Sequence, residues 1–145
     1  MADIVVKADL KTHIPISTVD KITGADDTIV TAALNTSFSE AKSYLSRFNL
    51  TKLFDSTATG YVADVNLQSK IKDLTCWHLI QRANANIDMQ LFKENYDDAI
   101  TWLKDVSRGL ADPAGWPLAD DDPDTEWPED STLHYNSNDK RTNHF

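Results

Sequence analysis

The placement of proline divides this chain into two parts. Four of its five prolines fall within sixteen residues, at positions 113, 117, 123 and 128. A proline lacks the backbone N–H that a helix needs, and it disfavours helix at the residue before it. We therefore expect an extended or turn-rich path after Leu110, whereas the residues before it are free to form helices.

Apolar residues before that boundary recur at spacings of three and four, which predicts amphipathic helices at about 27–48, 66–84 and 89–109. The segment 66–84 is apolar over more than half its circumference, as is usual for the central helix of a bundle. Two shorter helices are expected within 3–22, and a loop with one short helical turn is expected within 49–65.

Polar residues and glycines mark the expected helix ends. Ser17 followed by Asp20 resembles a capping box, in which each side chain bonds the backbone near the other. Aspartates at 26 or 27 and at 88 are candidate N-caps, and Gly24 and Gly109 are candidate stops. Pro15 is expected to end the first short helix, and Leu50–Phe54 to form the turn in the loop.

The length of 145 residues suits one hydrophobic core. We expect an all-α fold, a small bundle of four to five helices in residues 1–109 with a long irregular C-terminal arm in residues 110–145. No apolar run is long enough to span a membrane, and the N-terminus does not resemble a secretory signal. The single cysteine, Cys76, excludes an intrachain disulfide and a cysteine zinc cluster.

Charge is distributed unevenly between the two parts. Residues 1–109 hold 14 acids and 12 Lys+Arg, whereas residues 110–145 hold nine acids and only two bases. An acidic arm repels a phosphate backbone, which argues against nucleic acid as its ligand. It favours a basic protein surface as partner, or it keeps the arm solvated.

The arm is nevertheless rich in large side chains, unlike a solvated tail. Exposed aromatics that become buried on contact are typical interface anchors, and basic groups at the tip can pair with carboxylates. The candidate docking residues are Trp116, Trp127, Tyr135, Lys140, Arg141 and Phe145. The alternative is that the arm folds back on its own body.

The residues offer no catalytic set, cofactor site or metal site, so we do not expect an enzyme. The four histidines are scattered, and no glycine-rich phosphate loop is present. Cys76 and His78 lie close in sequence on one predicted helix, but we expect a core or interface role for His78 and no thiol–imidazole pair. The acidic run that begins at Asp120 lacks the glycine and the glutamate of a helix–loop–helix calcium site, where it has Thr125 and Ser131.

Three segments together resemble a known family. They are Lys72–Leu79, Asn95–Lys104 with the following Arg108-Gly109, and the terminal Tyr135–Phe145. The pattern is similar to the small head-to-tail connector, or adaptor, proteins of tailed bacteriophages, of the Mu-phage connector-like kind and closest to versions from Bacteroidetes phages. One departure is Asp139, where the family motif has proline, which puts a rigid turn there in question.

The resemblance implies a helical bundle of four or five helices and a structural role in the virion neck, with assembly in the cytoplasm of the bacterial host. Copies would form a ring, commonly of twelve, beneath the portal protein. The ring would extend the DNA channel, let the genome pass without specific binding, and present a surface for the next stopper or tail protein.

Two other functions fit parts of the sequence. A stopper or tail-completion protein has a similar size, but such proteins are generally richer in strand patterns. An acidic inhibitor that mimics DNA would account for the net charge of −9, but mimics usually spread acids over the folded body, and here the body is nearly neutral.

Overall fold

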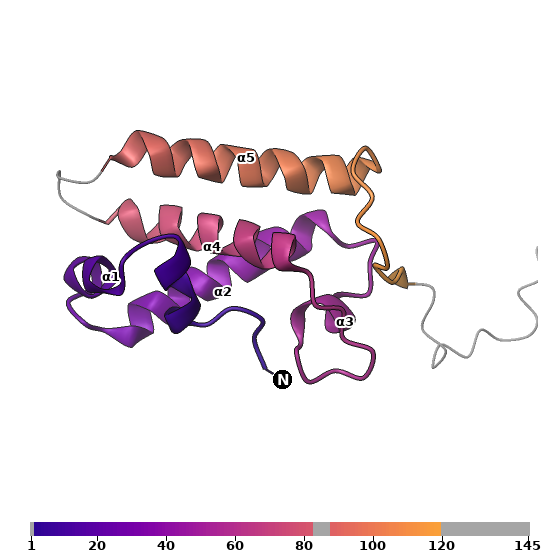
Figure 1. Cartoon of the computed structure of the whole chain (residues 1–145), viewed down its shortest axis with the longest axis horizontal. Coiled ribbons are helices and arrows are strands. Elements are labelled where there is room, and N and C mark those ends of the chain that lie inside the picture. Colours follow the sequence, from indigo (N-terminus) through magenta and orange to yellow (C-terminus); the bar gives the residue numbers. More distant parts are fainter. Residues whose placement is uncertain (1, 83–87, 120–145) are drawn as a thin grey trace, which may run out of the picture.

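The computed structural model describes residues 2–82 and 88–119 and is all-α, as the sequence predicts (Figure 1). Within these residues, the only β-pairing consists of two isolated antiparallel bridges. Each predicted helix is present with bounds shifted by a few residues. In chain order the elements are a 3₁₀ helix η1 (Lys7–Thr12), α1 (Ile16–Thr23), α2 (Asp27–Tyr44), α3 (Leu50–Phe54), α4 (Val65–Ile80) and α5 (Met89–Arg108).

Helix α4 is the centre of the bundle, which confirms its interpretation from the sequence. It packs against α5 along one side, against α2 along another, and also against η1 and α1 (Figure 1). Seven of its sixteen residues are buried, including Thr75, whose hydroxyl donates to the Ile71 carbonyl at 2.8 Å and lies 3.0 Å from the Ser37 hydroxyl of α2. Those bonds let two polar side chains enter the core without an unpaired group.

Local signals set most helix ends where the sequence places them. Asp26 accepts the Thr28 N–H at 2.9 Å at the start of α2, and Asp88 accepts two N–H groups at the start of α5. Gly24 and Gly109 end α1 and α5 in the left-handed conformation, with φ of 64° and 76°. Glycine suits these positions because it has no Cβ atom and adopts a positive φ without the steric cost that other residues meet.

The predicted capping box at Ser17 is wrong. Helix α1 begins at Ile16, with Pro15 as its N-cap and no side-chain cap bond. The fixed φ of proline suits a helix start. The carboxylate of Asp20, expected to complete the box, instead accepts from the Lys7 ammonium at 2.8 Å. Lys7 also reaches Asp27 at 2.7 Å, so this ion pair links the N-terminal segment to α1 and α2.

Helix α2 ends at Tyr44, four residues before the predicted end. Leu45 and Phe48 continue the apolar spacing, and both are buried, but they lie in the turn that leads to α3. Apolar spacing reports which side chains reach the core, and a turn can serve that purpose as well as a helix. The predicted short helix at Leu50–Phe54 is confirmed.

The chain does not leave the body at Gly109. Residues 110–119, which we call the strap, fold back along the end of the bundle (Figure 1). Asn49 N–H donates to the Pro117 carbonyl at 2.9 Å, and the Ala119 N–H donates to the Arg47 carbonyl at 3.0 Å. The sequence predicted that these residues belong to an irregular arm. They fold back on the body instead. None of the helices in the described residues is long and apolar enough to cross a membrane.

Candidate interaction surfaces

Trp116 fastens the strap to the bundle. Its side chain is only 8% exposed, and its indole N–H donates to Asp64 Oδ2 at 2.8 Å. Its ring meets Phe48 and Trp102 edge-on, with centroid distances of 5.1 and 5.9 Å. The edge-to-face geometry favours both ring pairs, and the carboxylate makes the hydrogen bond charge-assisted.

The two carboxylate oxygens of Asp64 accept different hydrogen bonds. While Oδ2 holds Trp116, Oδ1 accepts the Leu67 N–H at 2.8 Å and so caps α4. Arg47 adds a second link, because its guanidinium lies 4.5 Å from the centroid of the Phe48 ring and donates to the Val106 carbonyl at 2.9 Å. The start of α4, the end of α5 and the strap are thereby joined.

A polar contact joins the three long helices. Glu40 of α2 accepts the Tyr96 hydroxyl of α5 at 2.6 Å and lies 3.1 Å from His78 Nε2 of α4. Burial raises the pKa of Tyr96, and the bond to Glu40 raises it further, so the phenol stays a donor. Glu40 interrupts an apolar stripe in the sequence, and that interruption was the signal of this contact.

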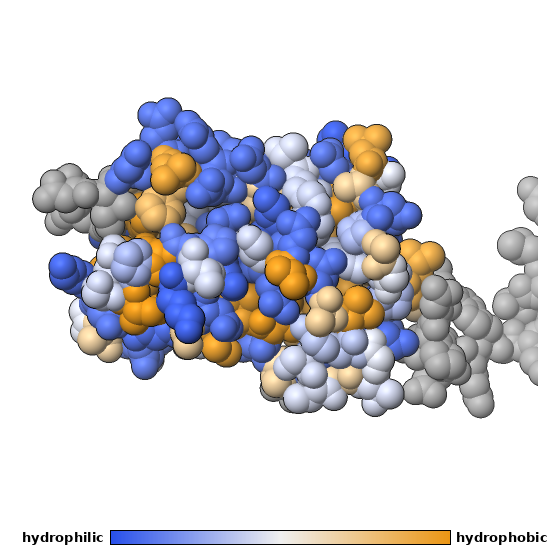
Figure 2. Space-filling model, in the orientation of Figure 1, coloured by the Kyte–Doolittle hydropathy of each residue, from blue (hydrophilic) through white to orange (hydrophobic). Residues whose placement is uncertain are grey.

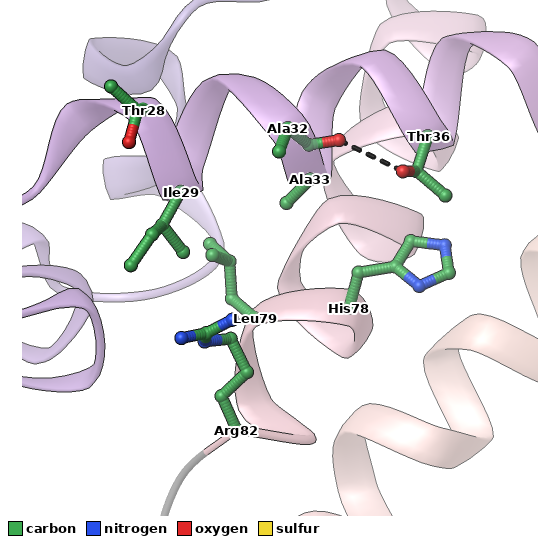
Figure 3. Close-up of a pocket in the computed structure, with 8 residues that line it drawn as sticks. All are labelled: Thr28, Ile29, Ala32, Ala33, Thr36, His78, Leu79 and Arg82. Atoms are coloured by element: carbon green, nitrogen blue, oxygen red, sulfur yellow. Dashed lines mark hydrogen bonds between the residues drawn. The ribbon is translucent and has the colours of Figure 1, made fainter.

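A shallow groove lies between α2 and the C-terminal end of α4 (Figure 3). Its volume is about 350 Å³, and its walls are small or apolar side chains with one cation at the end. The lining residues are Thr28, Ile29, Ala32, Ala33, Thr36, His78, Leu79 and Arg82. A more open, polar hollow continues past His78 along α2.

The opposite end of α4 carries exposed apolar side chains. Val65, the first residue of α4, is 80% exposed, Leu110 at the start of the strap is 75% exposed, and Leu118 is 44% exposed. We call these three residues the end patch. Apolar groups are visible on the same end of the surface in Figure 2. Large exposed apolar side chains at one end of a molecule are candidates for a contact surface.

A second histidine lies in a polar cluster between η1 and α4. His13 Nε2 is 3.1 Å from Ser69 Oγ and 3.5 Å from Asp73 Oδ1. Burial raises the pKa of Asp73 to about 6, with a smaller contribution from Asp98 of α5, whereas Lys70 opposes the shift. Burial also lowers the pKa of His13. Burial therefore disfavours the charged form of each group, and we assign the cluster to packing.

The described ranges, 2–82 and 88–119, hold no group of three potential metal ligands. Cys76 is buried, and burial raises the pKa of its thiol to about 12, so the nucleophilic thiolate is suppressed. His78 turns to Glu40, in keeping with its expected role in the core or at an interface. The acidic run tested for calcium, from Asp120 to Ser131, lies outside the described residues.

Of the six candidate docking residues, the structure describes one. Trp116 packs against its own body and is not a free anchor in this conformation. The other five, Trp127, Tyr135, Lys140, Arg141 and Phe145, lie outside the described residues, and their docking role stays a prediction. The sequence did not predict the groove, the role of Asp64 or the end patch. In the case of the end patch, Val65 and Leu110 look like ordinary apolar residues of their segments, and nothing local shows that they are exposed.

A family model described as Bacteriophage Mu, Gp36 matches residues 5–129. The chain belongs to this family. No curated protein and no solved structure shows a significant match. The Gp36 match includes most of the acidic stretch after the strap and ends before the terminal segment that contributed to the resemblance noted in the sequence. Membership makes this a phage protein and suggests structural or morphogenetic work associated with the virion.

Proposed function

We propose that this Gp36-family protein is a non-enzymatic head-to-tail adaptor of the virion neck, of the Bacteroidetes-phage type. Copies form a ring beneath the portal, extend the DNA channel and dock the next stopper or tail protein. The observation that carries the proposal is the family match over residues 5–129 of a body built as a helical bundle. The suppressed Cys76 thiolate is consistent with a structural role.

The charge distribution supports the proposed passage of DNA. Residues 110–145 hold nine acids and two bases, and like charges would keep the genome from adhering to a channel lined by them. In this proposal the terminal aromatic and basic residues contact the portal or an adjacent copy. The strap sets where that segment starts, because Ala119 is held at Arg47.

A reconstruction of the neck of the virion tests the proposal directly. We expect a ring of this chain between the portal and the tail. Density for the chain within the tail tube, or inside the head, would overturn the adaptor assignment. A position directly below another ring that itself contacts the portal would identify a stopper or tail-completion protein instead.

Truncation separates docking by the C-terminal segment from support of the fold. A chain that stops after Ala119 keeps the strap, so we expect it to fold normally and fail to yield infectious particles. A chain that stops after Gly109 loses Trp116 as well, so we expect reduced stability in addition. Normal infectivity of the Ala119 truncation would contradict a docking role for residues 120–145.

A further inference from the structure

The groove and the end patch lie at opposite ends of α4. Leu79 of the groove and Val65 of the end patch are separated by fourteen residues, which is about 21 Å along a helix. Leu110 is held at the C-terminal end of α5, because its N–H donates to the Asp105 carbonyl at 2.8 Å. The patch therefore cannot fill the groove of its own chain, and any occupant comes from another molecule.

We propose that the end patch of one copy docks into the groove of the next copy, with Leu110 inserted over Ala32 and Ile29. A leucine side chain suits a groove walled by small and apolar groups. Charge complements this fit, since exposed Asp112 lies two residues after Leu110, and exposed Arg82 borders the groove. Asp26, which also interacts with Arg82, is engaged in capping α2 through Thr28.

Two different surfaces at opposite ends make this contact head-to-tail. A head-to-tail contact repeats from copy to copy, and it gives a ring when the rotation closes, whereas a contact between identical surfaces stops at a dimer. The inference rests on the proposed function and deepens it, because it supplies the contact between neighbouring subunits of the ring. Its occupant is a second copy of this chain.

Disulfide trapping tests the contact in the full-length chain. In Ala32→Cys with Leu110→Cys, the two thiols of one molecule lie too far apart to bridge, because a disulfide needs Cα atoms within about 7 Å. Mild oxidation should therefore give a ladder that extends past the dimer on a non-reducing gel. Each single variant should stop at the dimer, and native Cys76 is buried and does not contribute.

The matched control places the first cysteine one residue away. Thr31 is exposed on α2 but does not line the groove, so Thr31→Cys with Leu110→Cys should give little ladder. Arg82→Glu or Asp112→Lys, added singly to the Ala32/Leu110 pair, should lower the ladder yield about two- to fivefold, the range that an exposed ion pair supports. The two charge changes together should restore it.

A ladder no stronger than that of the Thr31 control overturns the contact, as does a product confined to dimers. These results are independent of the neck reconstruction. A ring seen in the virion without the ladder means that another surface joins the subunits. A ladder from a chain that is absent from the neck means that the self-contact is real and the adaptor function is wrong.

Discussion

The indole nitrogen of Trp116 lies 2.8 Å from the Oδ2 atom of Asp64, across 52 positions of sequence. This hydrogen bond joins a proline-rich segment to the first turn of the central helix. The same carboxylate caps that helix through the Leu67 N–H. Losing either side chain should therefore affect both the strap and the start of α4.

Trp116→Ala should lower the free energy of unfolding by about 3–5 kcal/mol, the usual cost of removing a buried tryptophan. Trp116→Phe loses the N–H and one ring of the indole but keeps part of the ring packing, so it should cost less. Urea unfolding measures both. Leu110→Ala is the control, because that side chain is 75% exposed and should change stability by less than about 0.5 kcal/mol. Equal effects at the two positions would show that the strap is not fastened.

Asp64→Asn and Asp64→Ala should separate the two duties of this residue. Asparagine caps a helix about as well as aspartate, but its NH2 group cannot accept the indole N–H, so the first change should keep the cap and lose the indole bond, at a cost of about 1–2 kcal/mol. Alanine removes the cap as well, and its cost should be about 2–3 kcal/mol. Repeating both Asp64 changes in the Trp116→Phe background gives the coupling energy between Asp64 and Trp116. If the costs of the single changes simply add, the direct bond between the two side chains is contradicted.

Tyr96 should titrate later than an ordinary tyrosine. The raised pKa of its phenol means that Tyr96 should remain protonated in alkali that ionises an ordinary tyrosine, while the fold persists. Ultraviolet absorbance follows this, and the late component should be missing from Tyr96→Phe. Tyr61→Phe is the comparison, and loss of the late component there would refute the assignment. Tyr96→Phe should also cost about 1.5–3 kcal/mol, typical of a hydrogen bond to a charged group.

Asp73 should make the protein less stable as pH rises. Its pKa of about 6 lies above the ordinary 3.8, so between those values the folded state binds more protons than the unfolded state. Asp73→Asn should therefore exceed the native protein in stability at pH 7 by about 1–3 kcal/mol and lose that advantage below pH 4. Urea unfolding at several pH values measures the difference.

Two comparisons accompany the Asp73 experiment. Asp97→Asn removes only an exposed pair with Lys93 and should shift stability by less than about 1 kcal/mol at every pH. His13 should act with the opposite sign, because its lowered pKa means that the unfolded state takes up the proton first as the pH falls below 6.5. A pH-independent difference for Asp73→Asn would contradict the buried-carboxyl interpretation.

The parts of the fold that the sequence predicts well depend on close neighbours. Asp26 caps α2 through a residue two positions away, and Gly109 needs only its own φ to end α5. The apolar spacing of α4 likewise reports its burial from within a single helix. Such features are visible in a short window of residues, and the structure confirms them.

The parts that the sequence did not predict depend on distant partners. Trp116 looks like a free anchor in a proline-rich segment until Asp64 and Trp102 are placed beside it. Glu40 looks like an exception in an apolar stripe until Tyr96, 56 residues later, donates to it. A groove between two helices has no local signature at all, because its lining comes from segments about fifty residues apart.

The fastening of the strap also determines where the last 26 residues begin. They start beside Arg47, at Ala119, and not at the free end of α5. From this fixed tether point, a partner site can be reached only within the contour length of the segment, at most about 85–95 Å. A binding site inside that radius experiences a high effective concentration of the terminal residues, whereas one beyond it experiences none.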